Sequence, residues 1–312
     1  MRFLLEKGES VVGISRSPEP HEAFLPYRWL DEPRDFEFHA LDLNRDIDEI
    51  DALIRKTRPR YVVNFAAQSM VAESWQHPEH WFETNVVATV RLHERLRQLD
   101  FLDKYVHVTT PEVYGSTSGR VREDAPFNPS TPYAVSRAAA DMSLRSYFKA
   151  YDFPVSFTRA ANVFGPGQQL YRIVPRTVLF LRLGRKLQLH GGGLSERSFI
   201  HAADVADATE RVARSGRPGE TYHISTDRQV SIRKLVEMIC DRLDARFEDS
   251  VEVVGERLGK DAAYCLDSTK IRQELGWTDA MTLEEGIEQT VVWVDRYFDA
   301  LAKLPMEYQH KP

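Results

Sequence analysis

The sequence predicts an α/β fold in which a doubly wound parallel sheet carries a smaller α/β domain toward the C-terminus. Short apolar stretches alternate with helical ones through the first 165 residues, which favours a parallel sheet with helices on both faces. After residue 165 the alternation gives way to loops and short elements, and 312 residues are enough for a second unit. We therefore assign residues 1–165 to a first domain, with part of 200–226 returning to it, and 166–312 mainly to a second.

The first domain begins with the end of a helix, residues 1–8, for which Gly8 is a C-terminal stop. Pro132 suits the first position of a later helix, because its missing N–H is not needed there, and Thr131 can cap that helix. We expect strands, the first of them buried, at 10–16, 38–43, 60–65, 104–109 and 153–160, and helices at 47–57, at 78–99 and from 132 onward.

Helix caps also organise the second domain. Asp204 is well placed as an N-cap after His201, which we expect to be a packed or hydrogen-bonded histidine, and Ser231 can cap a helix over 232–243. Thr282 and Glu285 form a capping box that begins the last amphipathic helix.

Composition excludes several classes of function. The chain is 42% hydrophobic and 28% charged with a net charge of −6, so neither a nucleic-acid partner nor binding to a membrane surface is expected. The two cysteines, Cys240 and Cys265, lack metal-ligand spacing and fit a reducing compartment, and no metal is expected. Without a membrane-spanning apolar run or a signal peptide, a cytoplasmic location is expected.

A tyrosine and an arginine on one helix give the first chemical indication. Tyr133 and Arg137 are four residues apart, so they share one helical face. A guanidinium beside a phenol favours the phenolate, which lowers the tyrosine pKa toward a value useful for proton abstraction. A lone pair at this spacing would more simply be a surface feature of an amphipathic helix, so the surrounding sequence has to decide.

Two motifs flank this helix: T-T-P-E-V-Y-G at 109–115 and A-N-V-F-G-P at 161–166. In this order and spacing they resemble the extended short-chain dehydrogenase/reductase family, and within it the nucleotide-sugar 4,6-dehydratases. The resemblance runs from the first residues almost to the last. It implies a Rossmann-like fold, an NAD(P) cofactor and a nucleoside-diphosphate sugar substrate. It also implies a homodimer or homotetramer, formed through the helix at 78–99 and the helix of Tyr133.

The resemblance assigns catalytic roles to Thr110, Glu112, Tyr133 and Arg137. Tyr133 would take the proton of the sugar C4 hydroxyl while hydride leaves C4 for the nicotinamide. Thr110 would hydrogen-bond the C4 oxygen. Glu112 would remove the proton from C5, after which water leaves from C6 and hydride returns there.

On the cofactor side, the family begins one strand earlier, with a glycine-rich turn for the pyrophosphate. That strand and turn are absent, and we favour a truncated sequence over a sheet without its central strand, which would expose backbone groups. Arg16 lies where a basic residue of the family would accept the 2′-phosphate of NADP, which favours NADP, although NAD is possible. An arginine in a solvated loop is a nearly equal interpretation of Arg16. The other cofactor residues assigned by resemblance are Asp42, Leu43, Ala66, Ala67 and Gln68, together with Tyr133 and Arg137.

Basic residues cluster after residue 165, although the chain as a whole is acidic. Such a cluster suggests a phosphate-bearing ligand, although some of these residues could form a solvated basic face. The substrate residues assigned in this way or by resemblance are Gln68, Asn162, Arg172, Arg176, Arg197 and Arg257.

Two positions depart from the family pattern. Relatives carry lysine at Arg137, and the bulkier, forked guanidinium is not a conservative replacement. Pro111 replaces the aspartic acid of dTDP-glucose dehydratases and the small hydroxyl residue of GDP-mannose dehydratases. Because Pro111 argues against dTDP-glucose, and because Arg16 and the A-Q-S at 67–69 resemble the GDP-mannose branch, we expect a GDP-mannose-like substrate.

Two alternatives remain open. Another enzyme of the same fold, a 4-epimerase or a UDP-glucuronate decarboxylase, would share most of these motifs, although Glu112 favours a dehydratase because a C4 epimerase needs no base at C5. A catalytically impaired nucleotide-sugar binder would explain Arg137, Pro111 and the missing glycine turn together.

Overall fold

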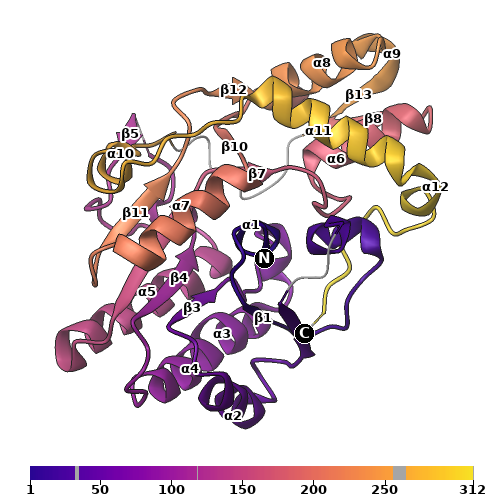
Figure 1. Cartoon of the computed structure of the whole chain (residues 1–312). Helices are drawn as coiled ribbons and strands as arrows, with labels where there is room; N and C mark the ends of the chain where they lie inside the picture. Colours follow the sequence, from indigo (N-terminus) through magenta and orange to yellow (C-terminus); the bar gives the residue numbers. More distant parts are fainter. Residues whose placement is uncertain (32–34, 118, 256–264, 312) are drawn as a thin grey trace.

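The computed structural model describes residues 1–31, 35–117, 119–255 and 265–311. At its centre is a four-stranded parallel sheet in the order β11-β6-β4-β3 (Figure 1). Its strands are β3 (Tyr61–Asn64), β4 (Lys104–Thr109), β6 (Val155–Ala160) and β11 (Thr221–Ile224).

Helices cover both faces of this sheet, so the predicted doubly wound α/β fold is confirmed (Figure 1). Val106 and Tyr222 point toward α7 (Ala202–Ser215) and α10 (Thr269–Leu275), whose apolar residues share one core with them. Tyr105 and Phe157 point to the opposite face and pack with residues of the helices there. Those helices are α2 (Ile47–Thr57), α4 (Thr89–Leu96) and α5 (Pro132–Tyr151).

The sheet is interrupted beside β3. The strands β1 (Val11–Ser15) and β2 (Phe36–Ala40) pair in parallel with each other, and among the described residues neither pairs with β3. The two sheets are therefore separate among the described residues. This separation explains why β1 is not the buried strand that the sequence predicts, since Val12 and Ile14 are 37% and 39% exposed.

The helix predicted at 78–99 changes its winding midway. It starts as α3 (Pro78–Phe82), continues as the π-helical segment η4 (Glu83–Ala88), and ends as α4. Single-turn π segments are rare and often occur at functional sites. Here the segment holds Asn85, which is fully buried.

A second group of elements packs beside the sheet around its own apolar core (Figure 1). Its helices are α6 (Ile173–Arg182), α8 (Ile232–Arg242), α9 (Phe247–Ser250), α11 (Leu283–Arg296) and α12 (Phe298–Leu301). The paired strands are β8 (Leu187–His190) with β13 (Val251–Val254), β7 (Asn162–Phe164) with β10 (Phe199–His201), and β9 (Glu196–Arg197) with β12 (Val230–Ser231). A further short pair joins β5 (Arg120–Val121) and β14 (Cys265–Leu266). The domain boundary at residue 165 stays a prediction.

Several predicted caps are present. Thr131 and Ser231 accept backbone N–H groups of their helices, and the Thr282–Glu285 capping box is formed. Asp204 is not an N-cap, because His201 caps α7 through its ring Nδ1. The Asp204 carboxylate accepts instead the N–H groups of Ala280 and Met281, at 2.9 and 3.2 Å, and so holds the segment before α11.

The remaining elements are short. At the N-terminus, α1 (Arg2–Glu6) ends where predicted, since Gly8 has a φ of +79°. The 3-10 turns are η1 (Glu22–Phe24), η2 (Pro26–Trp29), η3 (Ala72–Trp75), η5 (Pro111–Tyr114) and η6 (Gly191–Gly193). Among the described helices, none combines the length and the hydropathy that crossing a bilayer requires.

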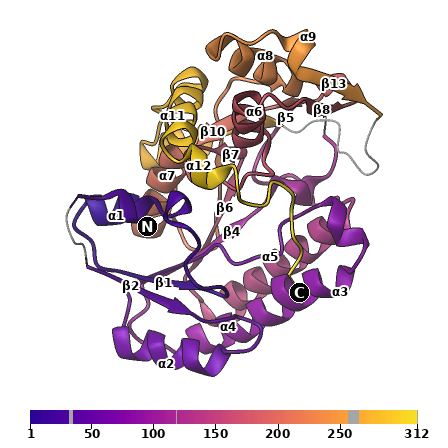
Figure 2. The ribbon, with the colours of Figure 1, turned by 90° about the vertical axis from the view of Figure 1, so that its right-hand side faces the viewer.

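After α12 the chain turns back toward the sheet. Residues 305–311, called here the C-terminal segment, run from the second group of elements to β1 and α3 (Figure 2).

Candidate active site

The loop after β4 holds two of the predicted catalytic residues. Thr110 caps η5, because its hydroxyl accepts the N–H of Glu112 at 3.2 Å. Pro111 follows at the first position of η5, where a proline fits without losing a hydrogen bond, and it is buried. Gly115 closes the turn with a φ of +65°, and a Cβ there would lie 2.2 Å from the backbone oxygen of Asn128.

Tyr133 lies against this loop from the first turn of α5. Its side chain is 8% exposed, and its phenol shares a hydrogen bond with the hydroxyl of Thr110. The charges of Glu112, Arg137 and Arg172 all act on the phenol. The structure therefore brings the four predicted catalytic residues together, with one predicted substrate residue beside them.

The Tyr133 pKa does not move in the expected net direction. Burial raises it, and the Glu112 carboxylate raises it further. The Arg137 guanidinium and the Thr110 hydrogen bond lower the pKa, as predicted for Arg137, but they do not overcome burial. The expectation of a lowered pKa is thus wrong for the protein alone, because the sequence shows the charge but not the depth of burial.

Arg137 is almost completely buried, with 2% exposure. Its Nη2 donates to the backbone oxygen of Val108, so the side chain is fixed against the end of β4. Its Nε and Nη1 are buried and have no hydrogen-bond partner in the part of the chain that the structure describes. Buried donors of this kind are rare in proteins, so these two nitrogens fit a bound acceptor such as the hydroxyl groups of a ribose.

The turn after β3 is held by the π-helical segment. Asn85 accepts the backbone N–H of Gln68 at 2.8 Å, and it donates to the Gln68 carbonyl and to the Ser136 hydroxyl at 3.0 and 2.9 Å. Ala66 is exposed and Ala67 half-buried, so no bulky side chain covers the turn. Gln68 itself is buried, and its side-chain Nε2 donates to the carbonyl of Lys311 at 2.6 Å.

The other predicted cofactor residues already have partners within the chain. Arg16 Nη1 donates to the same Lys311 carbonyl at 3.2 Å. Asp42 accepts the Asn44 N–H at 2.9 Å as part of the turn that leads into α2, and Leu43 packs at the edge of the core beneath it.

The predicted substrate residues are placed unequally. Arg172 is exposed, lies over the ring of Tyr171, and is close enough to influence Tyr133. Arg176 forms a two-pronged ion pair with Glu307, at 2.6 and 3.1 Å. Asn162 donates to the carbonyl of Ser198 at 3.2 Å, Arg197 donates to the carbonyl of Glu196 at 2.7 Å, and Arg257 lies outside the described residues.

Comparison with known proteins decides the family. The model of the GDP-mannose 4,6 dehydratase family matches residues 1–290. The chain belongs to the extended short-chain dehydrogenase/reductases. Within this family it is an enzyme of the nucleotide-sugar dehydratase and epimerase group.

Its relatives include dTDP-glucose 4,6-dehydratases. That of Xanthomonas campestris is 33% identical over 261 residues, covering 77% of this chain and 74% of the relative. That of Mus musculus is 35% identical over 266 residues, covering 83% and 72%. The dTDP-glucose 4,6-dehydratase of Streptomyces venezuelae, solved with NAD and TYD bound, has a TM-score of 0.84 and 32% identity, with 93% of this chain and 88% of that chain covered.

Sequence reasoning missed a buried polar network beneath the catalytic loop of this dehydrogenase/reductase. Asp141 accepts from Arg159 Nη2 at 2.7 Å and from the Thr109 hydroxyl at 3.1 Å. Arg159 also donates to the Tyr114 hydroxyl, which lies 2.8 Å from Nε2 of His223. Burial lowers the pKa of His223 to about 3, so this imidazole is neutral. No spacing in the sequence signals this network, because Asp141 lies on α5 and its partner Arg159 on β6.

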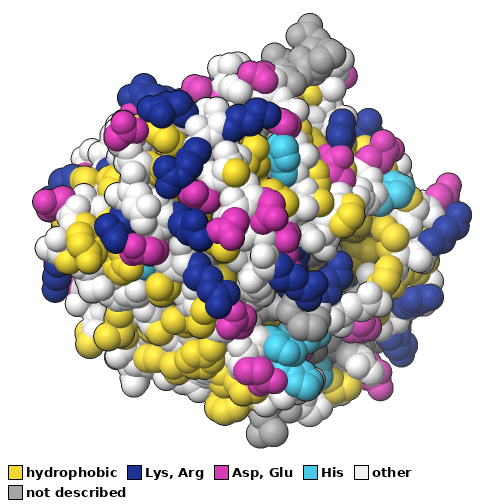
Figure 3. Space-filling model, turned by 90° about the horizontal axis from the view of Figure 1, so that it is seen from below, with side chains coloured by type: hydrophobic (Ala, Val, Ile, Leu, Met, Phe, Trp, Pro, Cys, Tyr) yellow, Lys and Arg dark blue, Asp and Glu magenta, His cyan; other side chains and the backbone are white. Residues whose placement is uncertain are grey.

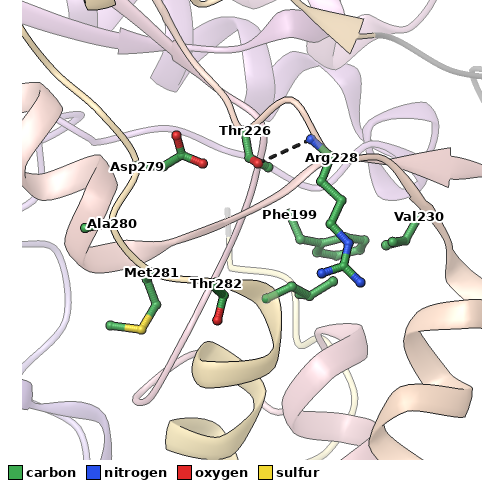
Figure 4. Close-up of a pocket in the computed structure, with 9 residues that line it drawn as sticks. Phe199, Thr226, Arg228, Val230, Asp279, Ala280, Met281 and Thr282 are labelled. Carbon is green, nitrogen blue, oxygen red and sulfur yellow. Dashed lines mark hydrogen bonds between the residues drawn. The ribbon is translucent and has the colours of Figure 1, made fainter.

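The pocket drawn in Figure 4 is not the active site. It has a volume of about 180 Å³ and lies between β10, β12 and the start of α11, and none of the predicted catalytic residues lines it. Its charged groups are paired within the chain: Arg228 with Glu284 at 2.8 Å, and Asp279 with Arg272 at 2.6 Å. Among the described residues, no group of histidine, cysteine and acidic side chains is arranged to hold a metal ion.

Proposed function

We propose that this enzyme is a nucleoside-diphosphate-hexose 4,6-dehydratase that uses a nicotinamide cofactor. The observation that carries the proposal is the joining of Thr110, Glu112 and Tyr133 at one corner, where the loop after β4 meets the start of α5. A tyrosine beside a hydroxyl serves oxidation at C4. A carboxylate at the same corner supplies the second base that a dehydratase needs at C5 and a C4 epimerase does not.

The chain's own groups would handle the protons. Tyr133 removes the proton of the C4 hydroxyl, and Thr110 orients the C4 oxygen toward the phenol. When bound, the nicotinamide supplies the acceptor and later the donor of a hydride. The resulting C4 ketone acidifies the C5 proton, which Glu112 takes, and hydroxide leaves C6 as water with a proton from Glu112 or solvent. The C5–C6 double bond so formed would then take the hydride at C6 and a proton from solvent or an acidic side chain at C5, which gives the 4-keto-6-deoxy sugar.

Arg137 and the turn at 66–68 are the residues that would hold the cofactor. The two unpartnered nitrogens of Arg137 suit the hydroxyl groups of the nicotinamide ribose, and the small residues Ala66 and Ala67 allow close approach of a ligand. Arg16 at the end of β1 favours NADP, whereas the similar Streptomyces enzyme was solved with NAD. The assay below therefore includes both cofactors.

Two observations favour different nucleotides in the substrate. Pro111 begins η5 as a buried structural residue and has no acidic group, which favours the GDP-mannose-like substrate expected from the sequence. The relatives from Xanthomonas and mouse are named for dTDP-glucose, which favours that sugar. We keep GDP-mannose as the proposed substrate and dTDP-glucose as its direct competitor.

The test is product analysis with GDP-, dTDP-, UDP- and CDP-hexoses in the presence of NAD or NADP. Mass spectrometry and NMR should show the loss of one water from one substrate, a 4-keto-6-deoxy sugar, and no net consumption of cofactor. Tyr133→Phe should abolish this product while it preserves nucleotide-sugar binding. Inversion at C4, conversion of added UDP-glucuronate to a UDP-pentose and carbon dioxide, or binding without any turnover would refute the dehydratase.

We also propose a homodimer. Apolar side chains of α5 and of the neighbouring α3 and η4 are exposed on the helical face: Val135 at 40%, Met142 at 62%, Phe82 at 38% and Val87 at 36%. Helices α3, η4 and α5 contact one another, so these residues can form one surface. A second copy of the same surface would complete a four-helix interface.

A further inference from the structure

The C-terminal segment is anchored first in the second group of elements. Met306 is 9% exposed and packs in the apolar core there. Glu307 pairs with Arg176, and the ring of Tyr308 meets that of Tyr171 edge-on, with centroids 5.4 Å apart. These contacts fix residues 306–308 beside Arg176, which is expected to meet the substrate, and beside Tyr171, whose neighbour in the chain is Arg172.

The other end of the C-terminal segment packs against α3. The His310 ring lies flat over Trp81, with centroids 5.0 Å apart and planes 8° apart. Its Nε2 is 2.8 Å from Nδ1 of His80. Histidine side chains gather on the face drawn in Figure 3, and the stacked set consists of His77, His80 and His310.

Lys311, the last described residue, accepts hydrogen bonds from two residues expected to bind the cofactor. The Lys311 carbonyl accepts from Gln68 Nε2 and from Arg16 Nη1, and Lys311 Nζ donates to the Ser17 hydroxyl at 3.1 Å. Arg16 and Ser17 follow the carboxyl end of β1, and Gln68 follows that of β3. In open α/β sheets, ligands bind outside the carboxyl ends of the strands.

From these contacts we propose that the C-terminal segment binds across the cofactor site and competes with the dinucleotide for Arg16 and Gln68. The proposal rests on the function proposed above. One backbone carbonyl takes a hydrogen bond from each of these two residues, so a ligand oxygen at the same place has to displace it. Glu307 likewise pairs with Arg176, so release of the segment also frees a positively charged side chain to bind the substrate phosphates.

The size of the effect follows from the population of the released form. If the segment is released in about one molecule in ten, the apparent affinity for the dinucleotide falls about tenfold. Deletion of residues 308–312 removes the competing contacts and leaves Met306 in its core. His310→Ala loosens the same contacts without shortening the chain, and His190→Ala, which alters a histidine outside the stacked set, is the matched control.

The experiment measures dissociation constants for NADH and NADPH by fluorescence titration. In parallel, trimming of the C-terminus by carboxypeptidase Y is followed by intact-mass spectrometry. We expect the deletion to bind the preferred cofactor about tenfold more tightly, His310→Ala to shift in the same direction, and His190→Ala to match the parent. Saturating cofactor should accelerate trimming of the parent chain.

Two results overturn the inference in distinguishable ways. Equal cofactor affinity in the parent and the deletion, with trimming unchanged or slowed by cofactor, overturns the competition alone. Binding of neither NADH nor NADPH by the parent and the deletion overturns the proposed function, and the competition falls with it.

Discussion

Asp141→Asn tests how much the buried network beneath the catalytic loop contributes to stability. Asp141 and Arg159 are both fully buried and 2.7 Å apart. Removing the carboxylate charge leaves Arg159 buried without its counter-charge, which costs about 3–5 kcal/mol in comparable buried pairs. The same variant weakens the support of Thr109, whose hydroxyl bonds Asp141 just before the catalytic loop.

The chain offers a matched control for this prediction. Asp295 pairs with Arg182 at the same 2.7 Å, but the two side chains are 43% and 38% exposed. Exposed ion pairs contribute about 0–1 kcal/mol, so Asp295→Asn should change the free energy of unfolding little. Urea unfolding followed by tryptophan fluorescence and circular dichroism compares the two variants with the parent. Equal losses in both variants would show that burial does not decide the strength of the pair.

Three further predictions concern catalysis, assembly and pH. Arg137→Met should shift the rate–pH profile to higher pH, because the guanidinium lowers the Tyr133 pKa. Arg137→Lys keeps the positive charge and should retain most of the parent profile. Identical profiles for the parent and both variants would contradict this role of Arg137. Met142→Glu should convert a dimer to a monomer in sedimentation velocity, and an unchanged mass would exclude the α5 surface as the interface. Burial and the neighbouring His80, His77 and Arg16 lower the pKa of His310, while Glu73 raises it, so the docked ring is neutral. Protonation therefore favours the released segment, and docking weakens as pH falls below about 6.5, the ordinary pKa of a histidine. The affinity advantage of the 308–312 deletion should therefore shrink between pH 7.5 and 5.5, and a constant advantage would refute a role for His310.

Local patterns in the sequence were sufficient for most helices and strands and for the start of α5, whereas the roles of Thr110, Glu112, Tyr133 and Arg137 came from the family resemblance. Thr131 and Pro132 start α5 as predicted, and Tyr133 and Arg137 share one face of it as their spacing predicts. Only the structure shows that this face is buried. These features depend on residues within one helical turn of each other, so a single sequence displays them.

The rest depends on residues that are distant along the chain. Glu307 reaches Arg176 across 131 positions, and Lys311 reaches Gln68 across 243. Neither pairing has a periodic or spacing signal. The raised pKa of Tyr133 has the same origin, because burial is a property of the folded chain and not of the helix that carries the residue.

The π-helical segment at 83–88 sets how the two halves of this helix face their surroundings. A π turn accommodates one residue more than an α turn, so the extra residue is absorbed locally and the helical faces on either side stay in phase. If the same residues were wound as an α-helix, one half of the helix would rotate by about 100° relative to the other. If the second half kept Leu92 and Leu96 in the core, Asn85 would turn away from Gln68. If Asn85 stayed in place, those leucines would turn toward solvent. The wide winding of this segment is therefore what keeps Asn85 against Gln68 and the two leucines in the core at the same time.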